Sequence, residues 1–188
     1  SISYLIESIL FEAKRKPAVM GTINYRVNGQ KISKAPNTTP APLLLQNILY
    51  QAKEAGCADA VMEVSSHALE YQRVRGIDFN IAVFTNLQRD HLDFHSTFDN
   101  YFAAKRKLFE NLISPANTKQ KKRAIINIDD PYGEKLAEML KNKVKLVTYS
   151  LTKPADFTAS DIKTSLDGVS FKINGKPAKI NLLGAHNV

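Results

Sequence analysis

The strongest constraint on this 188-residue chain is a repeated alternation of short apolar runs with longer amphipathic segments. The apolar runs have the length of single strands and lie at 58–64, 77–84, 123–128 and 145–150. The segments with helical spacing lie at 42–56, 97–112 and 134–142. This alternation predicts an α/β fold, a doubly wound and mainly parallel sheet with helices packed against it.

The two ends of the chain depart from this alternation. Apolar residues recur at helical spacing from Ile2 to Leu10, which predicts an opening amphipathic helix whose apolar stripe faces the core. Within 18–32, Asn28-Gly29 indicates a hairpin. From about Asp156 polar and apolar residues alternate, which predicts a small antiparallel sheet over 156–183 after an α/β core over 1–155.

The hairpins of that final segment have their own turn signals. Asp167-Gly168 and Asn174-Gly175 each stand between two alternating stretches. Both dipeptides tolerate the positive φ angles that two-residue hairpin turns require. We therefore expect three consecutive antiparallel strands near the C-terminus.

Composition narrows the class of protein. No apolar run reaches the ~20 residues that a membrane-spanning helix needs, so no span is expected. The single cysteine, Cys57, cannot form a disulfide framework, which favours a reducing compartment and hence the cytoplasm. The net charge of +8 leaves open a non-enzymatic polyanion-binding module, although the basic runs at 119–123 and 135–145 lack interleaved aromatics. An anionic small substrate would suit the same charge.

Potential metal ligands gather just after two of the predicted strands. They are Glu63, Asp90, His91, Asp93 and His95. Active sites of open α/β sheets lie at the carboxyl ends of strands, and Mg²⁺ prefers oxygen ligands while tolerating an imidazole. A metal-dependent phosphohydrolase would use the same groups. The structural alternative is that His95 caps a helix and that Asp93 accepts hydrogen bonds from backbone amides.

Hydroxyl groups mark two further positions. Thr38 and Thr39 precede a helix, where exposed amides favour an anion such as phosphate, although an ordinary N-cap would look the same. Ser65 lies in "EVSSH" (63–67), where a serine stands beside a histidine, but the flanking glycines of a hydrolase nucleophile are missing. It is therefore expected either to bind substrate or to cap the following helix.

Six motifs, taken in order, carry a resemblance to a known family. They are "NTTP" (37–40), "MEVSSHALEYQRV" (62–74), "FTNLQRDHLDFH" (84–95), "YFAAKRKLF" (101–109), "INIDDP" (126–131) and "LLGAHNV" (182–188). Together they resemble the central, ATP-binding domain of the Mur ligases over residues 1–188. The resemblance is strongest to the type that makes the UDP-N-acetylmuramoyl-tripeptide. A folylpolyglutamate-type ligase or another Mur ligase is the alternative within the same fold.

The resemblance implies a reaction in peptidoglycan synthesis. ATP phosphorylates the terminal carboxylate of UDP-N-acetylmuramoyl-L-alanyl-D-glutamate, and the amine of a diamino acid attacks the resulting acyl phosphate. The diamino acid is either lysine or meso-diaminopimelate, and Mg²⁺ is the cofactor. A monomer without a nucleic-acid partner is expected.

The resemblance also assigns roles to individual residues. Glu63, His91 and Lys105 match the magnesium and catalytic positions. In the family, the lysine is carbamylated, so that CO₂ converts a cation into a carboxylate. The positions that hold the muramoyl dipeptide correspond to Thr38, Thr39, Ser65 and Arg73. Those on the nucleotide side correspond to Asn86, Asp90 and Asn187, while Asp93 and His95 are expected around the ligands or facing substrate.

Several parts of the family pattern have no counterpart in these 188 residues. The phosphate-binding loop that ends in Gly-Lys-Thr or Gly-Lys-Ser is absent, as are the uridine-binding N-terminal domain and the amino-acid-binding C-terminal domain. The chain is therefore expected to be an excised core that is inactive alone and binds ATP poorly. We further expect Glu63, His91 and Lys105 to meet at one edge of the sheet.

Overall fold

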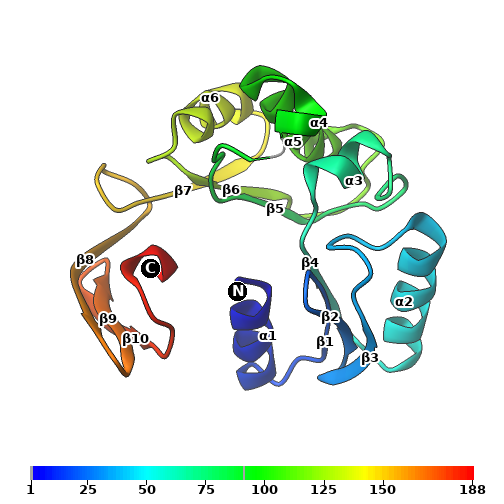
Figure 1. Ribbon diagram of the computed structural model, residues 1–188, viewed down its shortest axis with the longest axis horizontal. Coiled ribbons are helices and arrows are strands. Elements are labelled where there is room, and N and C mark those ends of the chain that lie inside the picture. The colour runs from blue at the N-terminus through cyan, green and yellow to red at the C-terminus, as the bar shows by residue number, and fades with distance from the viewer. Residues whose placement is uncertain (1, 91) are drawn as a thin grey trace. The chain divides into compact units, whose positions relative to one another are not determined.

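A computed structural model describes residues 2–90 and 92–188, with only the backbone described at Leu92 and His186. The chain forms two compact units, one reaching to Ile77 and the other running from Asp78 to Val188 (Figure 1). Each unit has its own sheet. The two are therefore described separately.

The first unit consists of one mixed sheet and three helices. Its elements are α1 (Ile2–Glu12), β1 (Pro17–Met20), β2 (Asn24–Val27), β3 (Gln30–Lys34), α2 (Pro42–Glu54), β4 (Asp59–Met62) and α3 (Ser66–Glu70). The sheet order is β3-β2-β1-β4, and only the β1–β4 pair is parallel. Asn28 (φ 49°) and Gly29 (φ 77°) form the turn between β2 and β3, so the hairpin expected there is confirmed.

The orientation of α1 differs from the sequence-based expectation. Its buried residues are Ser3 and Glu7, whereas Ile2 and Ile9 of the apolar stripe are 49% and 67% exposed. The reason is a polar anchor: Glu7 Oε1 lies 3.1 Å from Nε of Arg26 on β2. A buried carboxylate needs such a partner, so the ion pair fixes which face of the helix points inward.

The second unit continues the alternation of strands and helices. Its elements are β5 (Ile81–Phe84), α4 (Leu92–His95), α5 (Phe98–Ile113), β6 (Arg123–Asn127), α6 (Pro131–Leu140), β7 (Lys145–Ser150), β8 (Phe157–Ser165), β9 (Gly168–Ile173), β10 (Lys176–Ile180) and the 3-10 helix η1 (Ala185–Asn187). The sheet order is β10-β9-β8-β7-β6-β5. Strands β5 to β8 pair in parallel, and β8 to β10 pair antiparallel.

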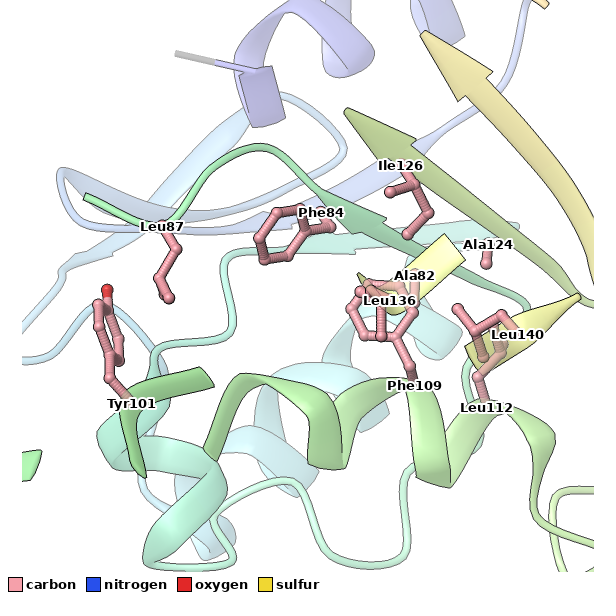
Figure 2. Packing of buried hydrophobic residues seen from close by; sticks show 10 residues of the cluster. All are labelled: Ala82, Phe84, Leu87, Tyr101, Phe109, Leu112, Ala124, Ile126, Leu136 and Leu140. Carbon is pink, nitrogen blue, oxygen red and sulfur yellow. The ribbon is translucent and has the colours of Figure 1, made fainter. Parts of the chain in front are cut away.

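The core of this unit lies between the sheet and helices α5 and α6 (Figure 2). Alternate residues of β5 and β6 point into it, among them Phe84 and Ile126, and they meet Phe109 of α5 and Leu136 of α6. Burial of each such side chain stabilises the fold by ~1.5–3 kcal/mol. Gly133 lets α6 approach β6, because a Cβ there would lie 1.9 Å from the carbonyl oxygen of Asn127.

The fold class expected from the sequence is confirmed: the chain is α/β with a mainly parallel sheet and antiparallel strands near the C-terminus. Those hairpins do not form a separate sheet, however, because β8 joins β7 through the register Tyr149↔Phe157. The turn at Asn174-Gly175 has the expected positive φ angles, 47° and 80°. Among the described residues, no helix combines the length and the apolar character needed to cross a bilayer.

Candidate functional site

The carboxylate of Glu63 occupies a polar cage in the first unit. Glu63 directly follows β4, and its amide continues the parallel ladder by donating to the carbonyl of Met20 at 2.9 Å. Its Oε1 accepts a hydrogen bond from Ser3 Oγ at 3.2 Å. Its Oε2 accepts bonds from Oγ1 and N of Thr22 at 2.9 and 3.4 Å. The carboxylate is thus oriented by donors from α1 and from the segment after β1.

Gly21 supplies the space that this carboxylate uses. A Cβ at position 21 would lie 3.2 Å from Cδ of Glu63 and 3.4 Å from both carboxylate oxygens. The contact at 3.2 Å is tighter than an ordinary van der Waals separation. Glycine at the end of β1 is therefore part of the site.

Three of the four residues expected to bind the dipeptide form one network beside Glu63. The hydroxyl of Thr39, which is 0% exposed, donates to the carbonyl of Glu63 at 2.8 Å and accepts from the amide of Ser65 at 3.0 Å. Arg73 Nη1 donates to the carbonyl of Thr39 at 3.1 Å. Thr38 joins through its Oγ1, which lies 3.2 Å from Oγ1 of Thr22. The structure thus gathers all four around the Glu63 segment.

The helix caps near this network show which of the expected hydroxyl groups cap a helix. Ser65 is the N-cap of α3, since its Oγ accepts a bond from the amide of Ala68 at 3.2 Å. Helix α2 begins at Pro42, as expected, and its N-cap is Ala41 without a side-chain cap. Thr39 is therefore not a helix cap. Its hydroxyl is used within the network instead.

In the second unit, Lys105 lies half-buried on α5 with its Nζ 5.1 Å from the ring centroid of Tyr101. Burial lowers the pKa of the Lys105 amine, and the charge of Asp90 acts in the opposite direction. Lys107, two residues along the same helix, is exposed. Of these two lysines, Lys105 is thus the more buried one.

The ring of Tyr101 belongs to an aromatic stack that the sequence did not reveal. The rings of Tyr101 and His95 are stacked, with centroids 5.0 Å apart and an interplanar angle of 18°. Phe94 meets His95 edge-on at 4.8 Å. His95 is only 6% exposed, and Thr97 rather than His95 is the N-cap of α5. The spacing of Tyr101 and Lys105, four residues apart on a helix, was the available signal.

The segment after β5, which holds Asn86 and Asp90, is fixed at its start by two anchors. Asn127 Nδ2 donates to the carbonyl of Thr85 at 2.8 Å. The amide of Leu87 donates to Asp130 Oδ2 at 2.6 Å. Asn86 and Asp90 are exposed. Asp130 also caps α6 through its other oxygen, a role that an aspartate followed by proline signals in the sequence.

Three predicted residues remain, namely Asn187, His91 and Asp93. Asn187 lies in η1, and its Nδ2 donates to the carbonyl of Leu183 at 2.8 Å. His91 falls outside the described residues. Asp93 lies in the first turn of α4 and is exposed. Within the parts of the chain that the structure describes, His, Cys, Asp and Glu side chains form no group of three suited to a metal ion. The meeting of Glu63, His91 and Lys105 stays a prediction.

Comparison with known proteins identifies the family. The model of the Mur ligase middle domain matches residues 1–188. The chain belongs to the Mur ligase family. It is similar to the UDP-N-acetylmuramoyl-L-alanyl-D-glutamate--2,6-diaminopimelate ligase of Geobacter metallireducens, with 44% identity over 89% of the chain and 32% of that relative. The ligase of the same name from Clostridium perfringens is 40% identical over 99% of the chain and 38% of the relative. The chain thus spans about a third of the length of these curated relatives.

Solved Mur ligase structures resemble the chain over nearly its whole length. A structure of a UDP-N-acetylmuramoyl-L-alanyl-D-glutamate--2,6-diaminopimelate ligase matches with a TM-score of 0.82 and 35% identity, covering 99% of this chain and 38% of that one. MurF from Acinetobacter baumannii matches with a TM-score of 0.66 at 15% identity, covering 98% of this chain and 36% of that one. The second likeness shows a shared fold alone.

Proposed function

We propose that this chain is the middle domain of an ATP-dependent ligase that joins a diamino acid to UDP-N-acetylmuramoyl-L-alanyl-D-glutamate in the cytoplasm. The observation that carries the proposal is the 44% identity, over 89% of the chain, to a relative named for that reaction. The two residue networks around Glu63 and Lys105 supply groups suited to it. ATP would provide the phosphoryl group that activates the dipeptide carboxylate.

In this proposal Glu63, His91 and Lys105 hold Mg²⁺. The donor chemistry fits, because the Glu63 carboxylate is already oriented by two hydroxyls and an amide, and Mg²⁺ prefers oxygen ligands. The lowered pKa of Lys105 leaves more of its amine uncharged, which is the form that reacts with CO₂. The N–C bond forms as one C=O bond of CO₂ opens to an oxyanion, and the amine loses a proton to solvent. When bound, the metal would neutralise charge on the transferring phosphoryl group.

The dipeptide substrate would be held by the network beside Glu63. Arg73 offers a guanidinium suited to the carboxylate or phosphate groups of such a substrate, although one of its nitrogens already donates to Thr39. Thr38 is partly exposed and Ser65 retains acceptor capacity, so both can contact a ligand directly. Thr39 is fully buried, and its part would be to fix the backbone around Glu63 and Ser65.

The incoming amino acid is proposed to be 2,6-diaminopimelate rather than lysine, since the relatives at 40% identity or more are named for it. The test is a full-length ligase that contains this chain, supplied with ATP, Mg²⁺, the UDP-linked dipeptide and one diamino acid. We expect ATP-dependent formation of the UDP-linked tripeptide with diaminopimelate. Tripeptide formed with lysine alone would contradict that specificity.

The same assay separates the ligase from the hydrolase alternative. A metal-dependent phosphohydrolase would release phosphate at the same rate without the dipeptide. A ligase should release phosphate only when both the dipeptide and the amine are present. The 188-residue chain by itself is expected to show neither reaction and to bind ATP poorly, which calorimetric titration would measure.

A further inference from the structure

The ring of Tyr101 contacts two side chains of the second unit, those of His95 and Lys105. Its ring stacks on His95, and Nζ of Lys105 lies 5.1 Å from its centroid. Tyr101 and Lys105 are four residues apart on α5, which places them on the same helical face. Tyr101 is only 6% exposed, so its ring has little room to move.

His95 is also held in place by contacts of its own. The carbonyl of His95 accepts hydrogen bonds from the amide of Thr97 at 2.8 Å and from Asn100 Nδ2 at 3.0 Å. Phe94 meets the His95 ring edge-on. Thr97 is itself the N-cap of α5. The backbone of His95 is therefore tied to the start of the same helix that carries Tyr101 and Lys105.

We infer that Tyr101, backed by His95, is the positioning residue that fixes where the Lys105 amine lies. This inference rests on the proposed function, in which that amine carries the metal-binding carbamate. A lysine side chain has four rotatable bonds and loses much rotamer freedom when it is ordered. The Tyr101 ring, one helical turn away, restricts the Lys105 side chain before any ligand binds. Reacting groups require preorganisation of this kind.

The ring rather than the hydroxyl of Tyr101 carries this role, because stacking and the contact with Lys105 both involve the ring. Tyr101→Phe should therefore behave like the wild type, whereas Tyr101→Leu should not. Tyr132 provides a matched control. Nζ of Lys135 lies 4.7 Å from its ring, and that ring packs on Phe98 and Phe102 of α5. Tyr132→Leu thus removes a tyrosine of α6 that packs on α5, and leaves the ring beside Lys105 in place.

The first measurement is nuclear magnetic resonance of this chain labelled with ¹³C at the lysine ε-carbons. Protons over an aromatic face are shifted upfield, so the Lys105 ε-methylene should resonate upfield of the exposed lysines. Lys105→Arg assigns the signal by removing it. We expect the shift to remain in Tyr101→Phe and Tyr132→Leu and to disappear in Tyr101→Leu.

The second measurement is steady-state kinetics of the full-length ligase. Tyr101→Leu should lower kcat about tenfold, because misplacement of a reacting group by about 1 Å has effects of this size or larger. The KM for the UDP-linked dipeptide should stay unchanged, since that substrate is assigned to other residues. Tyr101→Phe and Tyr132→Leu should remain within about twofold of the wild type, because both variants keep an aromatic ring beside Lys105.

The outcomes separate this inference from the proposed function. A wild-type spectrum without the upfield signal would overturn the inference. So would an unchanged kcat in Tyr101→Leu when Lys105→Ala is inactive, and the proposed function would then stand. A fully active Lys105→Ala enzyme would overturn the assigned role of Lys105 and the inference with it.

Discussion

The two residue networks of this chain are built by different physical means. Around Glu63, the carboxylate is held by hydrogen bonds from α1 and from the segment after β1. The buried hydroxyl of Thr39 is hydrogen-bonded to the backbone of Glu63 and Ser65. Around Lys105, an amine lies against an aromatic stack. One network is polar and directional, and the other depends on packing.

The difference follows from the chemistry that each side chain offers. A carboxylate is already an oxygen ligand, so its surroundings need only orient it, and hydrogen bonds do this best. In the proposed reaction the lysine must first lose its charge before CO₂ can add. Burial favours that step, whereas a cage of acceptors would oppose it. The position of the Glu63 carboxylate should therefore respond to the loss or gain of single atoms in its cage. The position of the Lys105 amine should respond only to loss of the whole Tyr101 ring.

The largest effect is expected from removing the amine itself. In the full-length ligase, Lys105→Ala should cost about 3 kcal/mol of transition-state stabilisation, the size typical of one lost electrostatic group at a reacting centre. Lys105→Arg should be no better, because a guanidinium stays charged and cannot take up CO₂. Steady-state ligase assays measure both, and added acetate should partly restore the alanine variant.

The exposed Lys107 is the control for that experiment. Lys107→Ala should retain nearly full activity, since position 107 lies on a different face of α5. Equal losses at the two positions, or an active arginine variant, would mean that Lys105 acts only as a cation. The contrast between an oriented carboxylate and an activated amine would then be lost.

The next largest effect concerns the polar cage. Thr39→Val should lower the free energy of unfolding by about 2 kcal/mol, because a carbonyl and an amide inside the unit lose their shared hydroxyl partner. Thr39→Ser keeps that hydroxyl and removes one buried methyl group, with an expected loss of about 1 kcal/mol. Urea unfolding monitored by circular dichroism would rank the two. A serine variant as unstable as the valine variant would show that packing, not the hydroxyl, holds this network.

Asp129 extends the comparison to a carboxylate with no assigned catalytic role. Burial tends to raise its pKa, but hydrogen bonds from the amide of Leu151 and the hydroxyls of Ser150 and Thr152 outweigh this and lower it to about 2. A carboxylate with a depressed pKa in the folded state stabilises the fold above its ordinary value of 3.8. The stabilisation is lost as the pH falls from about 4 toward 2, and it amounts to about 1 to 2 kcal/mol.

Unfolding measured against pH tests this assignment. Asp129→Asn should be less stable than the wild type at pH 7 by a similar amount. The difference should narrow between about pH 4 and pH 2, because the wild-type carboxylate becomes protonated there. A constant difference down to pH 2 would show that the hydrogen bonds do not depend on the charge of Asp129.

The sequence predicted the positions of strands and turns better than it predicted which face of a helix is buried. β7 was expected at 145–150 and lies there, and the turns at Asn28-Gly29 and Asn174-Gly175 were set by residues that adopt positive φ angles. Such signals are local, so a short window of sequence contains them. The burial of Ser3 and Glu7 in α1 was missed because it depends on Arg26, which lies on a strand formed later in the chain.

The same division applies to the candidate site. Family motifs pointed to Glu63 and Lys105. The predicted strand ends and the helical spacing placed Glu63 just after a strand and Lys105 on a helix. The stacking of Tyr101 on His95 and the hydrogen bonds of the buried Thr39 hydroxyl could not be predicted, because stacking distances and shared hydrogen bonds arise only when separate segments pack together. Sequence reasoning thus named the candidate groups and missed the contacts that hold them.

The smallest effect on stability, and the sharpest test of the polar cage, is expected from Gly21→Ala. The added methyl group would lie 3.2 Å from Cδ of Glu63, and the flexible end of the glutamate can move a few tenths of an ångström away. The backbone of Gly21 needs no positive φ, so the change in stability should stay within about 0.5 kcal/mol. The carboxylate nevertheless leaves its position, and kcat of the full-length ligase should fall about three- to tenfold. In a Glu63→Ala background the methyl group meets no carboxylate, so Gly21→Ala should have no further effect there. An equal loss in both backgrounds would show that the methyl group acts on something other than Glu63, and that the cage is less sensitive to single atoms than its hydrogen bonds imply.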